Sequence, residues 1–335
     1  LHLLSRRQRQ MCIRDSSYAS LIKQFLCIKA ASYCEKTIIT YRRVLKGFDS
    51  YLETNRSHSI SKDTIDGWIQ TLHGADSTVS HAVGTIRRFT EYLVQSGIPA
   101  YVPAVPKIRD SYMPHIFTDE EIAHIIEIAD SYPSGGNNTV PHIRAMLPMI
   151  IRISLCCGLR LSEVINLKKR NFNASDGALV LEIAKDNKQR IVPMHESLSI
   201  LLQKYCIVMG VIGQPDAWLF PGKDDSAHIS LKTVDNRFRL ILREVNISRP
   251  DKKYERGACF HCLRHTFVQR SFVQLKEMGI SVDNSIPYLS IYLGHSNLRQ
   301  TERYMKFTTD MFLDEFQKFA AFSGDVFPEV CYENE

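Results

Sequence analysis

Apolar positions recur at helical spacing along most of this chain. Between residues 37 and 52 they return every three or four positions, and residues 77–95 repeat the pattern. Ser61 and the acids that follow it have the composition of a helix start, and a first helix fits around residues 22–29. The pattern therefore predicts a four-helix domain over residues 17–97.

The next segment, residues 98–116, is rich in proline. It carries four prolines together with Lys107 and Arg109. Prolines at this density disfavour regular structure and stiffen the chain, so this composition is typical of an extended basic linker.

A second domain is predicted over residues 117–325. Thr118 and Glu121 match a capping box at its start. A long apolar helix is expected from residue 140 to Cys157, and Gly158 is the kind of residue that ends a helix.

Alternating apolar and polar residues mark a β-hairpin inside this domain. The alternation covers residues 178–184 and returns at 189–193, with Lys185 at the tip. Helical spacing follows at residues 196–208, 231–245, 260–278, 286–293 and 310–322, and residues 326–335 form a tail. The expected fold is mainly α with a small β-hairpin or sheet, an α+β arrangement.

Composition narrows the class of protein. With 335 residues the chain can bury two cores, and its 44% apolar and 23% charged content is ordinary for a globular protein. No apolar run reaches the roughly 18 residues of a membrane span. The nine cysteines lack the spacing of a secreted disulfide framework and no signal peptide precedes them, so we expect reduced thiols in a cytoplasm.

Half of the net charge of +6 lies in residues 1–16, which hold four arginines and one aspartate. This arm has no helical or strand period. It is either a basic arm that contacts DNA phosphates or foreign sequence joined to a reading frame. Because it reads like translated sequencing adapter, we favour the second interpretation and leave it out of the fold.

Candidate chemistry comes from six residues spread over the second domain. They combine two guanidinium groups, one ammonium, two imidazoles and one phenol: Arg160, Lys185, His261, Arg264, His295 and Tyr304. A guanidinium matches two phosphate oxygens at once, an ammonium can release a proton, and a phenol can attack phosphorus. The set predicts a phosphoryl-transfer site with a protein nucleophile.

The order and spacing of these residues resemble the tyrosine recombinase (phage integrase) family. That family has an Arg in a Gly-Leu-Arg-x-Ser-Glu turn, a hairpin Lys, His-x-x-Arg, Leu-Gly-His, and a Tyr nine residues after that His. This chain has Cys-Gly-Leu-Arg160-Leu-Ser-Glu, Lys185, His261-Cys-Leu-Arg264, Leu-Gly-His295 and Tyr304. The resemblance implies an N-terminal four-helix DNA-binding domain of the core-binding, SAM-like kind and a tyrosine recombinase catalytic domain.

The resemblance also implies roles for the six residues. Tyr304 would attack a DNA phosphodiester to form a 3′-phosphotyrosyl link. Arg160, Arg264 and His295 would stabilise charge on the nonbridging oxygens. Lys185 would protonate the leaving 5′-oxygen, and His261 would act as acid, base or further donor. Fixed cations would replace the Mg²⁺ of other phosphoryl-transfer enzymes, so no cofactor is expected.

Three neighbouring features have more than one interpretation. Glu163 either orients Arg160 or is a plain carboxylate at the edge of the core. A zinc site from Cys259, His261, Cys262 and His265 is disfavoured, because one helix cannot surround a tetrahedral ion, and His265 is expected to pack behind the site. The 31 positions from Arg264 to His295 exceed the family pattern, which predicts an extra loop at residues 274–287 like those of transposon-borne members.

The implied partner is double-stranded DNA. Phosphate contacts are expected from five basic residues outside the catalytic set, Arg42, Arg43, Arg87, Arg88 and Lys107, and from Lys188 on the hairpin, although each could equally lie on a solvated face. The resemblance also implies a homo-oligomer, a tetramer on synapsed DNA, with accessory recombinases or DNA-bending proteins. The apolar stripe within residues 310–322 would dock on a neighbouring protomer or on its own domain.

The expected function is site-specific recombination for a mobile element, by integration, excision or transposition. A type IB topoisomerase uses the same intermediate, and a catalytically idle DNA-binding accessory protein would share the fold. The small helical first domain and the short C-terminal segment favour recombination. The sequence leaves the DNA target and the direction of the reaction open.

Overall fold

The computed structural model describes residues 18–108, 113–131, 140–182, 189–247, 256–295, 297–302 and 304. The described residues fall into two compact units, one ending at residue 108 and one beginning at residue 113. The N-terminal arm at 1–16, both hairpin lysines (Lys185 and Lys188), the helix expected at 310–322 and the tail at 326–335 lie outside the described residues.

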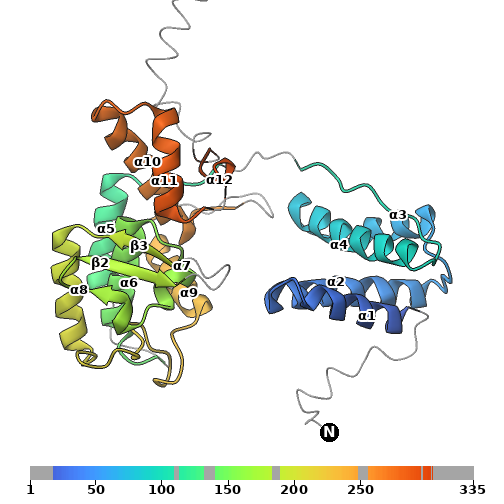
Figure 1. Cartoon of the computed structure of the whole chain (residues 1–335), viewed down its shortest axis with the longest axis horizontal. Helices are drawn as coiled ribbons and strands as arrows, with labels where there is room; N and C mark the ends of the chain where they lie inside the picture. The colour runs from blue at the N-terminus through green and yellow to red at the C-terminus, as the bar shows by residue number, and fades with distance from the viewer. Residues whose placement is uncertain are drawn as a thin grey trace, which may run out of the picture. The chain divides into compact units, whose positions relative to one another are not determined.

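The first unit is a bundle of four helices, as predicted (Figure 1). They are α1 (Ala19–Ala30), α2 (Glu35–Thr54), α3 (Lys62–Gln70) and α4 (Asp76–Gln95). Phe25, Phe48 and Phe89 are fully buried between them. The predicted start of α3 is confirmed, because the Ser61 hydroxyl accepts a hydrogen bond from the Thr64 N–H at 3.2 Å.

The first part of the expected linker packs on this bundle. The Tyr101 N–H donates to the Ile60 carbonyl at 2.8 Å. The Ser80 hydroxyl donates to the Pro106 carbonyl at 3.0 Å, and the Arg87 guanidinium donates to the Pro103 carbonyl at 2.9 Å. Proline has no N–H, but its carbonyl still accepts, so side chains of α4 can bind an extended Pro-rich strand.

The second unit holds a long buried helix surrounded by the remaining elements. That helix is α6 (Ile143–Cys157), and its neighbours are α5 (Asp119–Asp130), α7 (Leu161–Ile165), α8 (Glu196–Val208), α9 (Leu231–Glu244), α10 (His261–Glu277), α11 (Val282–Leu293) and the short α12 (Arg299–Glu302). The predicted capping box at Thr118 and Glu121 is present at the start of α5. Helix α6 begins three residues later than expected, because His142 has a left-handed backbone with a φ of 58°.

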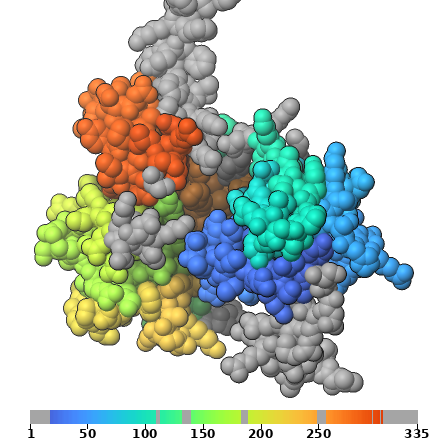
Figure 2. All heavy atoms as spheres, turned by 45° about the vertical axis from the view of Figure 1, so that its right-hand side comes forward, coloured from blue at the N-terminus to red at the C-terminus, as the bar shows by residue number. Residues whose placement is uncertain are grey.

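The second unit also holds a small antiparallel sheet. Its strands are β1 (Phe172–Asn173), β2 (Ala178–Glu182) and β3 (Gln189–Pro193), in the order β1-β2-β3. The predicted hairpin is β2 with β3, paired so that Leu179 faces Val192. Strand β1 was not predicted, since two residues are too few to show an alternation. In Figure 2 the orange atoms of α11 lie against the green to yellow atoms of the sheet.

The extra loop predicted at residues 274–287 is wrong. Helix α10 continues to Glu277, and α11 already begins at Val282, where the Ser281 hydroxyl accepts from the Asn284 N–H. Pro287 lies inside α11. A proline removes one backbone hydrogen bond and does not end the helix here, because burial of Ile286 and Leu289 holds the turn in place. The additional length therefore extends two helices.

Within the described ranges, no helix has both the length and the apolar character needed to cross a membrane.

The end of α6 depends on Gly158. Its φ is 60°, a left-handed conformation that favours glycine, and an added Cβ would lie 2.2 Å from the Phe267 ring on α10. The turn can thus form only with a residue that lacks a side chain.

We predict that Gly158→Ala lowers the free energy of unfolding more than Gly210→Ala does. Gly210 has a similar φ of 66°, but nothing lies within 4 Å of an added Cβ. Both variants should lose about 1–2 kcal/mol from backbone strain, and Gly158→Ala should lose about 1–3 kcal/mol more from the clash. Urea unfolding measures both values, and equal losses would contradict the proposed contact with Phe267.

Candidate active site

Five of the six predicted catalytic residues lie within one connected cluster of the second unit. Arg160 precedes α7, His261 and Arg264 lie in the first turns of α10, His295 follows α11, and Tyr304 follows α12. Lys185, the sixth, lies outside the described residues.

Arg264 is at the centre of the cluster and is almost completely buried, with 1% of its surface exposed. One terminal nitrogen donates to the Gly158 carbonyl at 2.6 Å, and the other donates to the Leu293 carbonyl at 3.1 Å and to His295 Nε2 at 2.9 Å. Its Nε donates to the Tyr304 hydroxyl over a longer 3.4 Å. The predicted nucleophile and the predicted phosphate-binding guanidinium are therefore in direct contact.

Glu163 holds Arg160 in place. Its carboxylate accepts from the Arg160 guanidinium at 3.0 Å and from the Arg160 backbone N–H at 2.8 Å. Of the two interpretations left open for Glu163, the orienting contact is the one observed. The carboxylate also lies 3.8 Å from Arg264, so one anion links two of the predicted phosphate ligands.

Arg190 on β3 is a third guanidinium at the same carboxylate, and sequence reasoning missed it. Both of its terminal nitrogens donate to Glu163, each at 3.1 Å, and only 9% of its side chain is exposed. The alternation of the strand could have indicated this residue, because Arg190 lies on the same face of β3 as the buried Val192. A charge on the inner face of a strand needs a partner.

The pKa of Glu163 reflects this environment. Burial by itself raises it, but the hydrogen bond and charge of Arg190, and then the N–H and charge of Arg160, outweigh that effect. The net result is a pKa below the ordinary value of 4.5, so Glu163 is ionised at neutral pH.

The contacts of His295 identify the ring nitrogen that carries its proton. A guanidinium can only donate, so His295 Nε2, 2.9 Å from Arg264, must be an acceptor. The proton is then on Nδ1, which donates to the hydroxyl of Thr301 at 2.7 Å. Burial and the charge of Arg264 lower the pKa of His295 to about 4, which agrees with a neutral ring. Thr301 is completely buried and had no signal in the sequence.

Three rings lie in a row from His261 through His265 to Tyr304. The His261 and His265 rings are 4.9 Å apart, and the His265 and Tyr304 rings are also 4.9 Å apart. His265 therefore contacts Tyr304 directly. Burial lowers the pKa of His265 to about 3, which keeps it neutral. The pKa of His261 is also lowered, by desolvation first and then by Arg264 and Arg160, but His261 is exposed, and solvent weakens such charge effects.

No group of three or more His, Cys, Asp or Glu side chains is placed to hold a metal ion in the part of the chain that the structure describes. Cys259 and Cys262 lie near each other instead, with sulfur atoms 3.8 Å apart.

The basic residues of the first unit that are predicted to contact DNA differ in whether other groups already bind their side chains. Arg42 and Arg43 on α2 are exposed, as is Lys107. Arg88 donates to the Gly84 carbonyl, and Arg87 pairs with Glu91 as well as with Pro103. Phosphate contacts by these residues stay a prediction, as does that of Lys188.

Comparison with known proteins decides the family. A model of the phage integrase family matches residues 115–310, more than half of the chain, and a model of the phage integrase N-terminal SAM-like domain matches residues 22–97. The chain belongs to the phage integrase family. All five residues of the cluster lie inside the first match.

Relatives and solved structures agree with this membership. A tyrosine recombinase XerD of Rickettsia conorii is 26% identical, covering 87% of this chain and 94% of its own length. A tyrosine recombinase of Thermosipho africanus is 23% identical, covering 82% and 89%.

The fold is similar to two solved integrase structures. A lambda integrase dimer bound to a COC′ core site has a TM-score of 0.64 at 17% identity, covering 85% of this chain and 97% of that one. The Tn1549 transposon integrase with a circular intermediate DNA has a TM-score of 0.63 at 16% identity, covering 91% and 100%. These matches confirm the predicted fold class of a phage integrase: a helical N-terminal domain followed by a mostly helical catalytic domain with a small sheet.

We predict that Glu163→Gln lowers the free energy of unfolding at pH 7 by about 3 kcal/mol, because it leaves three guanidinium groups without their anion. A carboxyl with a lowered pKa stabilises the fold above its unfolded pKa of 4.5 and loses that effect as the pH falls through the folded pKa. The difference from the wild type should therefore be constant near neutral pH and shrink below pH 4.5.

Urea unfolding at several pH values tests this. Glu127→Gln on α5 removes an exposed carboxylate from the same unit and serves as the matched control, with little change expected. A difference that grew on acidification would contradict the assignment of Glu163 as the shared anion.

Proposed function

We propose that this chain is a site-specific recombinase that cuts and rejoins double-stranded DNA through a 3′-phosphotyrosyl intermediate. The observation that carries this proposal is the contact between the Tyr304 hydroxyl and the Arg264 guanidinium at 3.4 Å, inside a chain of the phage integrase family. The hydroxyl proposed to attack and the guanidinium proposed to bind the phosphate are one hydrogen bond apart.

The chemistry follows from the positions of the charges. The Tyr304 oxygen attacks the phosphorus and forms a new P–O bond while the bond to the 5′-oxygen breaks. The five-coordinate transition state places extra negative charge on the nonbridging oxygens. Arg160, with 38% of its side chain exposed, can turn both terminal nitrogens to those oxygens. Its backbone N–H stays bonded to Glu163.

Arg264 must exchange partners to take part. Its Nε–H meets the Tyr304 hydroxyl and one terminal nitrogen meets His295 Nε2, so a phosphate oxygen would replace one or both. The exchange is favourable, because a bond from a guanidinium to a charged phosphate is stronger than one to a phenol or a neutral imidazole. Binding of DNA would thereby release the Tyr304 hydroxyl for attack.

The remaining steps are assigned to three residues. Lys185 would give its proton to the leaving 5′-oxygen. His261, exposed at the start of α10, would assist as acid, base or further donor. His295 would donate to the same oxygens once Arg264 has turned to the phosphate and Nε2 carries a proton. The phosphoester bond is kept on the enzyme, so a different 5′-hydroxyl can attack it and join the strands anew.

The biological setting is also part of the proposal. Solved structures of similar fold include a lambda integrase tetramer bound to a Holliday junction and the Tn1549 transposon integrase with a circular intermediate DNA. We infer a tetramer on synapsed DNA that moves a mobile element, assisted by accessory recombinases or DNA-bending proteins. Such a protein would act in the cytoplasm at the bacterial nucleoid.

Tyr304→Phe should abolish the covalent protein–DNA adduct on a nicked suicide substrate. The variant loses only one hydroxyl, so binding of the uncleaved duplex should stay within a few-fold of the wild type. Tyr292→Phe, which alters a tyrosine of α11 outside the predicted site, is the matched control and should still form the adduct. Adduct formation by Tyr304→Phe at the wild-type yield would overturn the assignment of the nucleophile.

Arg160→Lys should lower the cleavage rate at least about 10²-fold, the loss typical of removing one donor to a developing oxyanion. An ammonium keeps the charge but cannot reproduce the two parallel bonds of the fork. Single-turnover cleavage of the same substrate measures the rate. Arg170→Lys, an exposed arginine of the same unit, should cleave normally. Cleavage by Arg160→Lys within a few-fold of the wild type would place Arg160 outside the reaction.

A further inference from the structure

Two cysteines flank His261 at the start of α10. Cys259 is partly exposed and Cys262 is fully buried, and their sulfur atoms are 3.8 Å apart. The Cys262 N–H donates to the Cys259 carbonyl at 2.9 Å, so the two residues close a single backbone turn. Residues three apart in such a turn bring their Cα atoms within the range that a disulfide requires.

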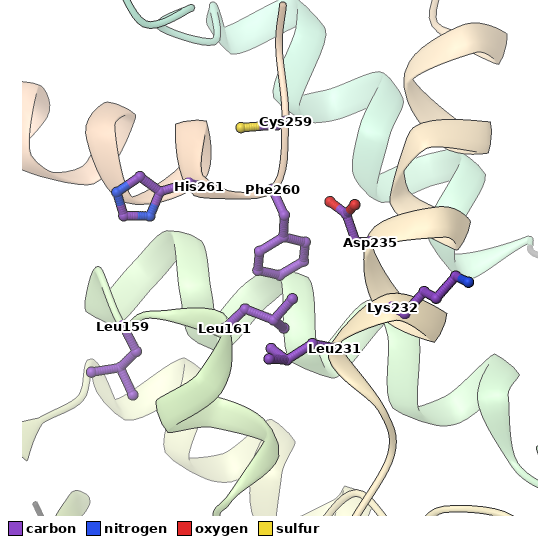
Figure 3. A pocket seen from close by; sticks show the side chains of 8 residues that line it. All are labelled: Leu159, Leu161, Leu231, Lys232, Asp235, Cys259, Phe260 and His261. Atoms are coloured by element: carbon purple, nitrogen blue, oxygen red, sulfur yellow. The ribbon is translucent and has the colours of Figure 1, made fainter. Parts of the chain in front are cut away.

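Cys259 lies beside an open cavity. The cavity has a volume of about 390 Å³, and its wall includes Cys259, His261, Leu161 and Asp235 (Figure 3). In Figure 3 Cys259 lies on the coil segment that leads into α10, with His261 on one side and Asp235 on the other. A small reagent can therefore approach this sulfur from solvent.

The surroundings favour the thiolate form of Cys259. The hydrogen bond with the Cys262 thiol, helped by the backbone N–H groups at the start of α10, lowers the pKa of Cys259 to about 6. Burial has the opposite effect elsewhere and raises the pKa of Cys156, Cys157 and Cys206. Thiolates are the nucleophiles of thiol–disulfide exchange, so Cys259 is the reactive member of the pair.

We propose that Cys259 and Cys262 form a redox switch, in which a low-molecular-weight disulfide oxidises the pair to an intramolecular disulfide and thereby lowers DNA cleavage. The expected loss of cleavage rests on the recombinase function proposed above. Formation of the disulfide does not depend on that function.

The reaction has two steps. The Cys259 thiolate attacks one sulfur of the reagent, breaks its S–S bond, forms a mixed disulfide and releases the first reagent thiolate. Cys262 then loses its proton to solvent, and its sulfur attacks Cys259 Sγ and releases the second reagent thiolate. The two cysteines lose two electrons, and the reagent disulfide gains them.

The disulfide would disturb the site through α10. The sulfur atoms must approach from 3.8 Å to a bond length of about 2.05 Å, which pulls on the turn between them. His261 lies inside that turn, and Arg264 lies two residues after Cys262. A shift of these two side chains moves them away from the phosphate.

The first test uses the full-length protein and glutathione disulfide as the reagent. Remaining thiols are alkylated, and the protein is digested with trypsin. Cleavage after Arg256 and Arg264 places both cysteines on one peptide, residues 257–264. Cleavage after Arg152 and Arg160 isolates the adjacent pair Cys156 and Cys157 on another, which serves as an internal control.

We expect the 257–264 peptide to lose two hydrogens and to escape alkylation, while the control peptide is alkylated at both cysteines. The same peptide recovered with both thiols alkylated, or with glutathione on Cys259 and no internal bond, would overturn the proposal. This readout does not depend on any activity toward DNA.

The second test measures cleavage of the nicked substrate by reduced, oxidised and re-reduced protein. Oxidation should lower the rate at least about tenfold, since a displacement of 1 Å in a catalytic site can cost on the order of 10²-fold, and dithiothreitol should restore it. Cys259→Ser should cleave at the reduced wild-type rate under both conditions. Cys156→Ser should still lose cleavage on oxidation, as the wild type does.

Protein that carries the Cys259–Cys262 disulfide and still cleaves DNA as fast as the thiol form would refute the switch. If the reduced wild type forms no adduct with DNA, the recombinase function fails, and the peptide test alone then decides whether the disulfide site exists.

Discussion

The buried charge of Arg264 is the constraint on which the candidate active site depends. A guanidinium with 1% exposure is tolerated only if its donors are satisfied. Two of its partners are carbonyls at helix ends, Gly158 after α6 and Leu293 at the end of α11. Such carbonyls have no partner within their own helix and carry the negative end of its dipole. Arg264 therefore joins α6, α10 and α11 at one point and fixes the turns that present Arg160 and His295.

The charges around Glu163 leave the site suited to an anion. Three guanidinium groups, from Arg160, Arg190 and Arg264, surround one carboxylate, so two positive charges are not neutralised within the group. The carboxylate keeps the cations close together despite their repulsion, and a phosphodiester can supply the missing negative charge. The fixed cations thus create a positive potential at the candidate site before any of them changes partner.

The sequence predicted what is encoded locally. Helix starts at Ser61 and Thr118 and the pairing of the hairpin strands depend on short-range patterns, and the described residues have each of them. The hairpin tip with Lys185 lies outside those residues. The sequence could not show which residues pair when they lie far apart along the chain. Arg190 binds Glu163 27 positions away, and Arg264 binds Gly158 106 positions away. The loop expected at residues 274–287 failed because the extra length between Arg264 and His295 was assigned to a loop, whereas α10 and α11 contain most of it.

The turn after α11 couples two residues that are far apart along the chain. Gly294 has a φ of 66°, and an added Cβ would lie 2.4 Å from an Arg190 nitrogen that is already bound to Glu163. A side chain at 294 and a guanidinium at 190 therefore exclude each other in this arrangement. A side chain at position 294 would strain the left-handed turn and would also displace Arg190 from Glu163. Gly294 and Arg190, 104 positions apart along the chain, are therefore coupled through one contact.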